Sequence, residues 1–326
     1  MQKTVLITNQ DLELLISHAI KKPRSFVIAH PEYIFSKTEI KKLINYITRY
    51  SKYEPIAYIL GYKEFFELKF KVTKDTLIPR SETETLVDLS IQEIKELIEY
   101  HIFNPFQKYS KQPSKPQQVT RKTQQKTCIC INILEIGTGT GCIPISILHE
   151  LNKSNLNYII KILAIDISDK ALQVAKDNWR TYHTHNNCHK LLFKKIDILD
   201  SKQVHTLLKD KKFDLIISNP PYIPSEEFTK LEKSVSVFEP RIALDGGKDG
   251  LIYYKAIFSS LKAHNQQSTV ILEIHENKAK EVKNIMKKYL NNYQENVIKD
   301  IFGKDRFIKI KSKNFMRNSK DDRLVV

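Results

Sequence analysis

The stretch Asn219-Pro220-Pro221-Tyr222 holds the residue types that most readily support chemistry in this chain. It follows the apolar run 213–218, which predicts a buried strand ending at the tetrapeptide. An Asn side-chain oxygen, a rigid Pro carbonyl and an aromatic face suit a planar NH2 group whose nitrogen attacks a methyl donor. A Pro-rich turn after a strand would explain the same residues without any chemistry. A second motif is therefore needed to distinguish a methyl-transfer site from a structural turn.

That second motif is the Gly-rich stretch 135–141, Glu-Ile-Gly-Thr-Gly-Thr-Gly, which lies between the apolar runs 129–134 and 142–148. A strand, a Gly-rich turn and a helix are typical of a nucleotide-cofactor loop, because glycines let the backbone approach a ligand closely. A further apolar run, 158–165, ends in Asp166, whose carboxylate would accept both ribose hydroxyls. The predicted cofactor loop consists of Gly137, Thr138, Gly139, Thr140 and Gly141.

The spacing of this loop separates two classes of cofactor. A dinucleotide loop reads G-x-G-x-x-G and places a pyrophosphate on a helix N-terminus. This loop reads E-x-G-x-G-x-G. Glu135 at its mouth would repel a pyrophosphate but suits a cationic aminoacyl sulfonium. We therefore favour S-adenosylmethionine over NAD.

Strands and helices are expected to alternate through residues 128–311, which predicts a mostly parallel, doubly wound sheet. Ligands of such sheets bind beyond the carboxyl ends of the strands, where Glu135, Asp166, Asp197 and Asn219 each fall. Asp197 or its neighbour Ile198 would contact the adenine, although Asp197 could equally be an ordinary turn residue. We expect strands near 129–136, 159–166, 190–196, 213–218, 268–274, 294–300 and 305–311, and helices over 141–151, 169–180, 251–262 and 276–290.

The chain before this region predicts a small helical domain, residues 1–62, and a hairpin or linker, residues 63–80. Ser36 to Glu39 fits a capping box ahead of a helix over 40–50. Ser81 to Glu84 fits a second capping box, which would open a helix over 82–100.

We expect residues 81–311 to form the catalytic domain. Within it, residues 104–127 are rich in Gln, Lys, Ser, Thr and Pro, which predicts a flexible insertion. A basic tether that touches RNA is the role we would consider for it. Residues 312–326 are expected to be a basic, disordered tail.

The 326 residues carry a net charge of +16, which invites a nucleic-acid interpretation. Residues 104–127 carry six Lys/Arg and no acid, and residues 309–326 carry six Lys/Arg and two acids. These two segments supply most of the excess, so the charge does not define a groove and we expect no specific nucleic-acid partner.

No apolar run approaches the ~20 residues that span a membrane, and no signal peptide is evident, so we expect a cytoplasmic protein without a membrane partner. The four cysteines, Cys128, Cys130, Cys142 and Cys188, lack C-x-x-C spacing and are expected to be free thiols. The stretch 183–189 contains three His and one Cys, but a solvated loop explains it better than a metal site.

Further stretches make the chain resemble the bacterial protein-(glutamine-N(5)) methyltransferases that act on peptide chain release factors, the PrmC or HemK family. The resemblance covers roughly residues 50–311. The family's linker pattern stands here as Glu-Pro-Ile-Ala-Tyr-Ile-Leu-Gly at 54–61, then Phe65, then Leu-Ile-Pro-Arg-Ser-Glu-Thr-Glu at 77–84. Phe-Glu-Pro-Arg-Ile-Ala-Leu at 238–244, the glycine-rich 246–251 and Gly-Lys-Asp-Arg at 303–306 also match.

The resemblance implies a class I S-adenosylmethionine-dependent methyltransferase, a Rossmann-like α/β fold with a mostly parallel seven-stranded sheet, behind an N-terminal substrate-recognition domain. It implies that the glutamine of a Gly-Gly-Gln motif in a release factor is the substrate. Asn219, Pro220 and Tyr222 would be catalytic, and Pro221 would join them in binding the substrate. Asn219 would also contact the cofactor. Arg80 and Glu84 would line the entrance, unless they form a salt bridge that docks the linker. We expect a monomer.

This chain departs from the family pattern in two places. His275 stands where the family commonly has a glycine, and the insertion at 104–127 is longer than expected. Three other functions stay open. The tetrapeptide would also suit the exocyclic amine of adenine in DNA or RNA. A glutamine of a ribosomal protein would fit the same pocket, and a binding module could keep the fold without the reaction.

Overall fold

The computed structural model describes residues 6–103, 129–153, 158–183, 189–264 and 266–313. The expected insertion at 104–127, almost all of the expected tail, and Cys128 and Cys188 lie outside the described residues. No helix in the described ranges combines the length and the apolar character that crossing a bilayer requires.

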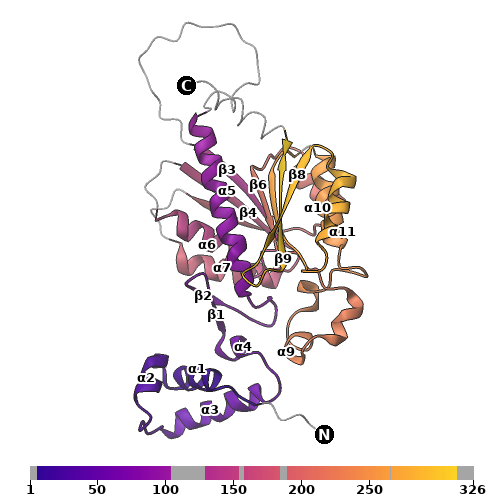
Figure 1. The fold of residues 1–326 in the computed structure, drawn as a ribbon. Coiled ribbons are helices and arrows are strands. Elements are labelled where there is room, and N and C mark those ends of the chain that lie inside the picture. The colour runs from indigo at the N-terminus through magenta and orange to yellow at the C-terminus, as the bar shows by residue number, and fades with distance from the viewer. Residues whose placement is uncertain (1–5, 104–128, 154–157, 184–188, 265, 314–326) are drawn as a thin grey trace, which may run out of the picture.

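The N-terminal unit is helical, as expected, and lies at the bottom of Figure 1. The Ser36 hydroxyl accepts from the Glu39 N–H and the Glu39 carboxylate accepts from the Ser36 N–H, so the first capping box is confirmed. A hairpin with Phe66 and Glu67 at positive φ connects this unit to the rest of the chain. The elements are α1 Asn9–Ile20, α2 Arg24–Ala29, α3 Lys37–Tyr50, α4 Ile56–Leu60, β1 Tyr62–Phe65 and β2 Leu68–Lys71.

The main domain is built on a seven-stranded sheet in the order β5-β4-β3-β6-β7-β9-β8. Strand β9 pairs antiparallel with both β7 and β8, and the other pairs are parallel, which confirms the mostly parallel sheet. The chain moves outward from β3 to one edge and then returns to β6 beside β3, so the strand order reverses between these two strands. The strands are β3 Ile129–Ile136, β4 Tyr158–Asp166, β5 Lys190–Lys195, β6 Leu215–Ser218, β7 Thr269–Glu273, β8 Tyr293–Lys299 and β9 Asp305–Ser312.

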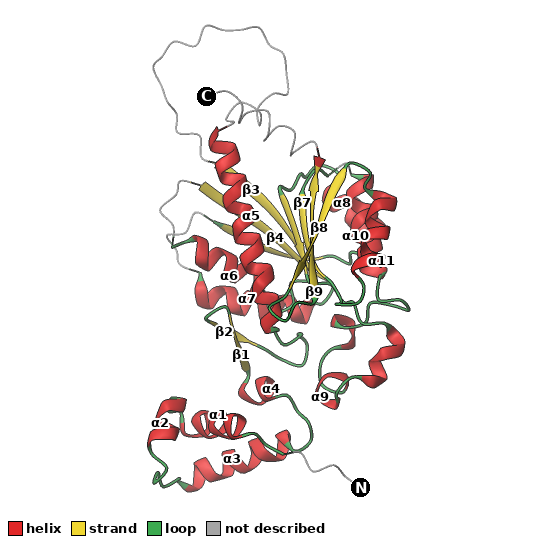
Figure 2. Cartoon of the chain, viewed as in Figure 1, coloured by secondary structure: helices red, strands yellow, loops and turns green. Residues whose placement is uncertain are grey.

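Helices cover both faces of this sheet (Figures 1 and 2). The side chains of β3 alternate between them: Ile131 and Ile133 join the core under α5 and α6, whereas Leu134 and Ile136 join the core under α8, α10 and α11. The helices are α5 Glu84–Phe103, α6 Cys142–Leu151 and α7 Asp169–Tyr182 on one face, and α8 Ser201–Leu208, α10 Ile252–Ala263 and α11 Ala279–Tyr289 on the other.

The start of α5 differs from the prediction. Residues Ser81–Thr83 form a 3-10 turn and the α-helix begins at Glu84. Glu84 Oε1 accepts a hydrogen bond from the Phe66 N–H at 3.0 Å, so this carboxylate serves the hairpin. The predicted second capping box is therefore wrong, because a contact from outside the helix takes the side chain that the box requires. Helix α8 and the short α9, Lys233–Ser236, were not predicted.

Candidate active site

The Gly-rich turn joins β3 to α6 at the centre of the sheet. Gly137 and Gly139 have φ of +77° and +55°, which a residue with a side chain rarely adopts. The N–H groups of Gly137 and Thr138 donate to the Ile165 carbonyl at 2.9 and 3.1 Å, which ties the turn to β4. The turn thereby presents Gly137 and Gly139 to a cavity beyond the strand ends.

The other three residues of the predicted loop, Thr138, Thr140 and Gly141, lie behind the cavity wall. Thr138 and Thr140 are buried, and neither they nor Gly141 line the cavity. Asn178 of α7 donates to the Thr140 carbonyl at 2.9 Å and exchanges two hydrogen bonds with the Lys71 backbone of β2. Asn178 was not predicted, although an Asn at an apolar-periodic position of a helix is a usable signal.

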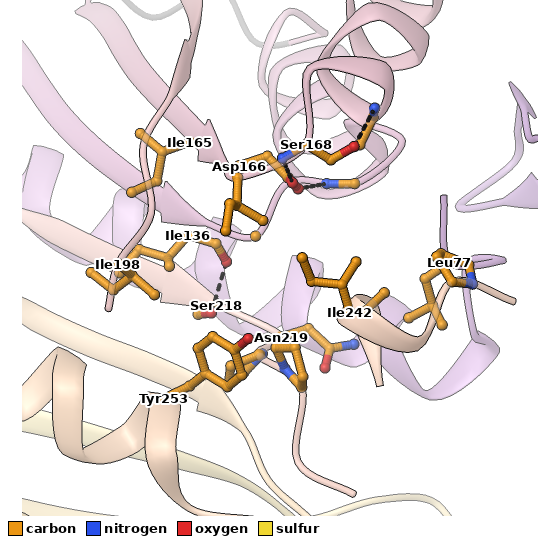
Figure 3. A pocket seen from close by; sticks show the side chains of 18 of the residues that line it. Leu77, Ile136, Ile165, Asp166, Ser168, Ile198, Ser218, Asn219, Ile242 and Tyr253 are labelled. Atoms are coloured by element: carbon orange, nitrogen blue, oxygen red, sulfur yellow. Dashed lines mark hydrogen bonds between the residues drawn. The ribbon is translucent and has the colours of Figure 1, made fainter. Parts of the chain in front are cut away.

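Asp166 lies at the end of β4, between the Gly-rich turn and the start of α7 (Figure 3). Its Oδ2 accepts from the Gly139 N–H and its Oδ1 from the Ser168 N–H, both at 2.9 Å. Burial raises the pKa of Asp166, and these backbone hydrogen bonds oppose that rise. Each oxygen keeps a further lone pair, so the carboxylate can also accept from two ligand hydroxyls.

The cavity walls are mainly apolar. Asp197 and Ile198 both line it, so the two predicted adenine contacts lie where a ligand could reach either. Three further residues line the cavity and were not predicted as site residues (Figure 3). They are Leu77 of the linker, Ile242 of the 3-10 turn Arg241–Ala243, and Tyr253 of α10. Four more isoleucines, Ile136, Ile165, Ile167 and Ile196, add to the apolar wall.

A second cavity meets the first at the tetrapeptide that follows β6. Asn219, Pro220 and Pro221 line both cavities, as do Leu77 and Ala243. Tyr222 and Arg80 line only the second. The order of the strands explains this position, because β6 lies beside β3 in the sheet, at the point where the strand order reverses.

The side chain of Asn219 is oriented by the chain segment just before α5. Its Nδ2 donates to Thr83 Oγ1 at 3.1 Å. No residue within the described ranges donates a hydrogen bond to Asn219 Oδ1. The amide therefore offers an acceptor at the border of the two cavities.

Tyr222 is held by its hydroxyl and by its ring. The hydroxyl donates to Glu273 Oε1 at 3.4 Å, and burial raises the pKa of Tyr222 above its ordinary value. The ring meets His275 edge-on, with centroids 5.9 Å apart and an angle of 76°. His275, the departure from the family pattern, thus packs against a predicted catalytic residue. The stacking of Tyr222 on a substrate amide stays a prediction.

Arg80 and Glu84 occupy different surroundings. Arg80 lines the second cavity and its Nη2 lies 2.5 Å from Glu239 Oε1. Glu84, which bonds Phe66, lines neither of the two cavities. The docking ion pair of the linker is therefore Arg80–Glu239, and the sequence reading did not identify Glu239 as the partner.

Glu135 does not lie at the mouth of the loop as expected. It is 1% exposed, and neither carboxylate oxygen has a hydrogen-bond partner among the described residues. Strand alternation explains this, because Glu135 shares the face of Ile131 and Ile133 under the helices. The loss of solvent raises the pKa of Glu135 to about 8.

Metal ligands do not cluster in the part of the chain that the structure describes: it holds no group of three or more His, Cys, Asp or Glu side chains suited to an ion. The His-rich stretch falls largely on residues 184–188, outside the described ranges. His189 is described, and its ring stacks on Tyr158.

Comparison with known proteins covers nearly the whole chain. Residues 3–61 match the PrmC N-terminal domain family, and residues 130–318 match a methyltransferase domain family. A release factor glutamine methyltransferase of Clostridium botulinum is 32% identical over 302 residues, which cover 92% of this chain and 90% of that protein. One of Fusobacterium nucleatum is 32% identical over 340 residues, covering 95% and 80%.

A bifunctional methyltransferase of Rickettsia bellii is 36% identical over 307 residues, which cover 93% of this chain but 51% of the relative. The chain thus spans about half the length of these bifunctional relatives.

Proposed function

The chain belongs to the release factor glutamine methyltransferase family, and from that premise we propose that it methylates the side-chain amide nitrogen of the glutamine in the Gly-Gly-Gln motif of peptide chain release factors, using S-adenosylmethionine. The family match supports the reaction and the class of substrate. The tripeptide motif and the roles of individual residues are proposals that rest on the two cavities.

The first cavity fits the proposed cofactor in its chemistry. Isoleucine side chains and Tyr253 offer apolar surface for an adenine ring. Asp166 offers a carboxylate for the ribose, and Gly137 and Gly139 leave backbone exposed for the aminoacyl part. S-adenosylmethionine would supply a methyl group made electrophilic by its sulfonium. Asp197 and Ile198 are the proposed adenine contacts.

The second cavity suits a carboxamide. An amide nitrogen is a weak nucleophile because its lone pair is delocalised into the carbonyl, so the protein must supply geometry and electrostatics. Asn219 Oδ1 would accept one N–H of the glutamine and the Pro220 carbonyl the other. Pro220 has a fixed φ, which keeps that carbonyl rigid. Two acceptors stabilise the positive charge that develops on the nitrogen, and the surplus proton then leaves to water.

One observation carries the proposal: the two cavities share Asn219, Pro220 and Pro221. A group seated in the second cavity would meet one seated in the first at these residues. Tyr222 and Arg80 line only the second cavity, so they would act on the substrate. Glu84 is outside both, and we no longer assign it to the entrance.

The test is mass spectrometry of release factors incubated with the protein and labelled S-adenosylmethionine. We expect one added methyl group on the peptide that contains Gly-Gly-Gln. Asn219→Ala should abolish this product while cofactor affinity falls much less. Parallel incubations with DNA, RNA and ribosomal proteins test the alternative methyl acceptors. Label in any of those acceptors and none in release factors would overturn the proposal.

The described residues place both cavities within one chain, which supports a monomer as the working unit. Light scattering of the purified protein tests this. Because the proposed substrate acts in translation, the reaction would take place in the cytoplasm.

A further inference from the structure

A chain of buried hydrogen bonds runs beneath Asn219. Asn219 Nδ2 donates to Thr83 Oγ1 at 3.1 Å, and Thr83 Oγ1 donates to Glu273 Oε2 at 2.8 Å. Thr83 is 3% exposed and Glu273 is 1% exposed. The three residues come from the end of β6, the turn before α5 and the end of β7, so the fold brings them together from distant parts of the sequence.

The number of protons shared by these hydrogen bonds fixes the orientation of the Asn219 amide. A threonine hydroxyl has one proton. While Glu273 is ionised, the carboxylate can only accept, so Thr83 gives its proton to Glu273 and can only accept from Asn219. The NH2 group of Asn219 must then face Thr83, which leaves Oδ1 for another donor.

A neutral Glu273 permits the opposite arrangement. Its own proton can be donated to Thr83, and the Thr83 proton is then free to point at Asn219. The amide turned over about its Cβ–Cγ bond, with Oδ1 toward Thr83, becomes a stable alternative. In that orientation Asn219 presents NH2 to the cavities and cannot accept an N–H from a substrate amide.

The same carboxyl holds a second residue of the tetrapeptide, because Tyr222 donates its hydroxyl to Glu273 Oε1. Burial raises the pKa of Glu273 to about 7, while its hydrogen bond from Thr83 and the charge of Arg306 lower it and the charge of Glu82 raises it. Tyr254 of α10 donates to the backbone carbonyl of Glu273. These groups surround a carboxyl whose charge changes near neutral pH.

We propose that Thr83 and Glu273 are positioning residues that hold the Asn219 amide with its oxygen toward the substrate, and that protonation of Glu273 releases this orientation. This inference rests on the proposed methylation for its catalytic consequence, but not for its structural one. Neither residue lines the two cavities. Thr83 acts through Asn219, whereas Glu273 acts through Asn219 by way of Thr83 and also contacts Tyr222 directly.

The chain contains a matched control. Thr269 Oγ1 donates to Glu93 Oε1 at 2.8 Å, the same length as the bond from Thr83 to Glu273. Both pairs are buried, and Thr269 begins the strand that Glu273 ends. Thr269→Val and Thr83→Val therefore each remove one buried Thr–Glu hydrogen bond of the same length, but only Thr83 contacts Asn219. Unlike Glu273 within the described ranges, Glu93 is also paired with Lys309 and Lys311.

We expect Thr83→Val to lower kcat on the order of tenfold with little change in the KM for S-adenosylmethionine, which is the size of one lost hydrogen bond. Thr83→Ser should recover most of the rate, and Thr269→Val should lose stability without losing kcat. The wild-type kcat should rise with pH through about 7, and Glu273→Gln should remove that limb. Equal kcat losses in Thr83→Val and Thr269→Val, or an unchanged pH limb in Glu273→Gln, overturn the inference.

A second readout needs no activity. The side-chain NH2 resonances of Asn219, assigned by their loss in Asn219→Ala, should shift with pH around a midpoint near 7 in ¹⁵N-labelled protein. The shift should vanish in Glu273→Gln and persist in Thr269→Val. If the protein methylates no release factor but the resonances behave in this way, the proposed function fails and the orientation mechanism stands. Resonances insensitive to pH would overturn the mechanism itself.

Discussion

Arg80 and Glu239 stand 159 positions apart in the chain and form an ion pair with 2.5 Å between Nη2 and Oε1. The other oxygen of Glu239 accepts the Ile78 N–H at 3.0 Å, and the Glu239 side chain is 1% exposed. The linker segment that contains Leu77 is thereby fixed against the catalytic domain, and Leu77 lines both cavities.

We therefore expect Glu239→Gln to weaken cofactor affinity by about three- to tenfold, because the loss of the ionic bond loosens the wall that Leu77 provides. Calorimetric titration with S-adenosylmethionine measures this. Glu54→Gln is the control, since Glu54 pairs with Arg49 at 2.6 Å in the helical unit, away from both cavities. If both variants changed the affinity equally, the docking role of Glu239 would be wrong.

Asp166→Ala should reduce cofactor affinity by roughly ten- to a hundredfold, the range expected when hydrogen bonds to a charged group are lost. The same titration checks this. Asp169→Ala supplies the comparison, because Asp169 is three residues away but exposed and paired with Lys195. A cofactor affinity that survives Asp166→Ala intact would remove this residue from the ribose site.

Gly250 lies against the backbone of the tetrapeptide. A Cβ at this position would come within 2.4 Å of the Tyr222 carbonyl oxygen, and its φ is +74°. Gly250→Ala should therefore displace Tyr222 and lower kcat by about tenfold or more, because small displacements of positioning groups are costly. Gly303→Ala is the matched variant, since Gly303 has φ of +78° with no atom within 4 Å of the added Cβ.

Both alanines should cost roughly 1–2 kcal/mol of folding free energy for the left-handed backbone. Thermal melts report the backbone strain that both variants share. A loss of kcat confined to Gly250→Ala reports the clash of its Cβ with the Tyr222 carbonyl oxygen. Full activity in Gly250→Ala would show that the tetrapeptide tolerates the displacement.

Glu135 predicts a dependence of stability on pH. Its pKa is about 8 in the folded protein, against an ordinary value of 4.5, so the folded state holds the proton more tightly than the unfolded chain. The stability from this group is complete below about pH 4.5 and is lost as pH rises through 8. Glu135→Gln should remove that decline from the free energy of unfolding, measured by urea titration across the range.

Glu99→Gln, at an exposed position of α5, controls for the loss of a carboxyl as such. A decline of the same steepness in wild type and Glu135→Gln would mean that Glu135 does not carry it.

The sequence predicted the sheet well because hydrophobic periodicity and the turn residues between elements are local features of the sequence. The runs that became β3 and β4, the Gly-rich turn, and the position of Asn219 at a strand end all follow from neighbouring residues. The contact between Thr83 and Glu273 escaped prediction because it joins residues 190 positions apart. Thr83 lies in the recognised stretch 77–84, but nothing in that stretch indicates its partner. Glu84 misled the prediction because it satisfies the spacing of a capping box, while its actual partner is the N–H of Phe66.

Glu239 shows the same limit, since it lies inside a recognised family stretch but its partners Ile78 and Arg80 are found only in three dimensions. Tyr253 was hidden for another reason. It lies in an amphipathic helix whose apolar positions look alike in sequence, and only the packed fold shows which of them reaches the cavity.

Helix α5 ends at Phe103 and β3 begins at Ile129, and β3 reaches the Gly-rich turn at its other end. The end of α5 lies in the upper part of Figure 1. The eight residues of β3 separate Ile129 from the Gly-rich turn by roughly 25 Å. The proposed reaction site and the point where the chain passes from α5 to β3 therefore lie at opposite ends of the central strand. We therefore expect a reporter sequence inserted between residues 103 and 129 to leave kcat unchanged.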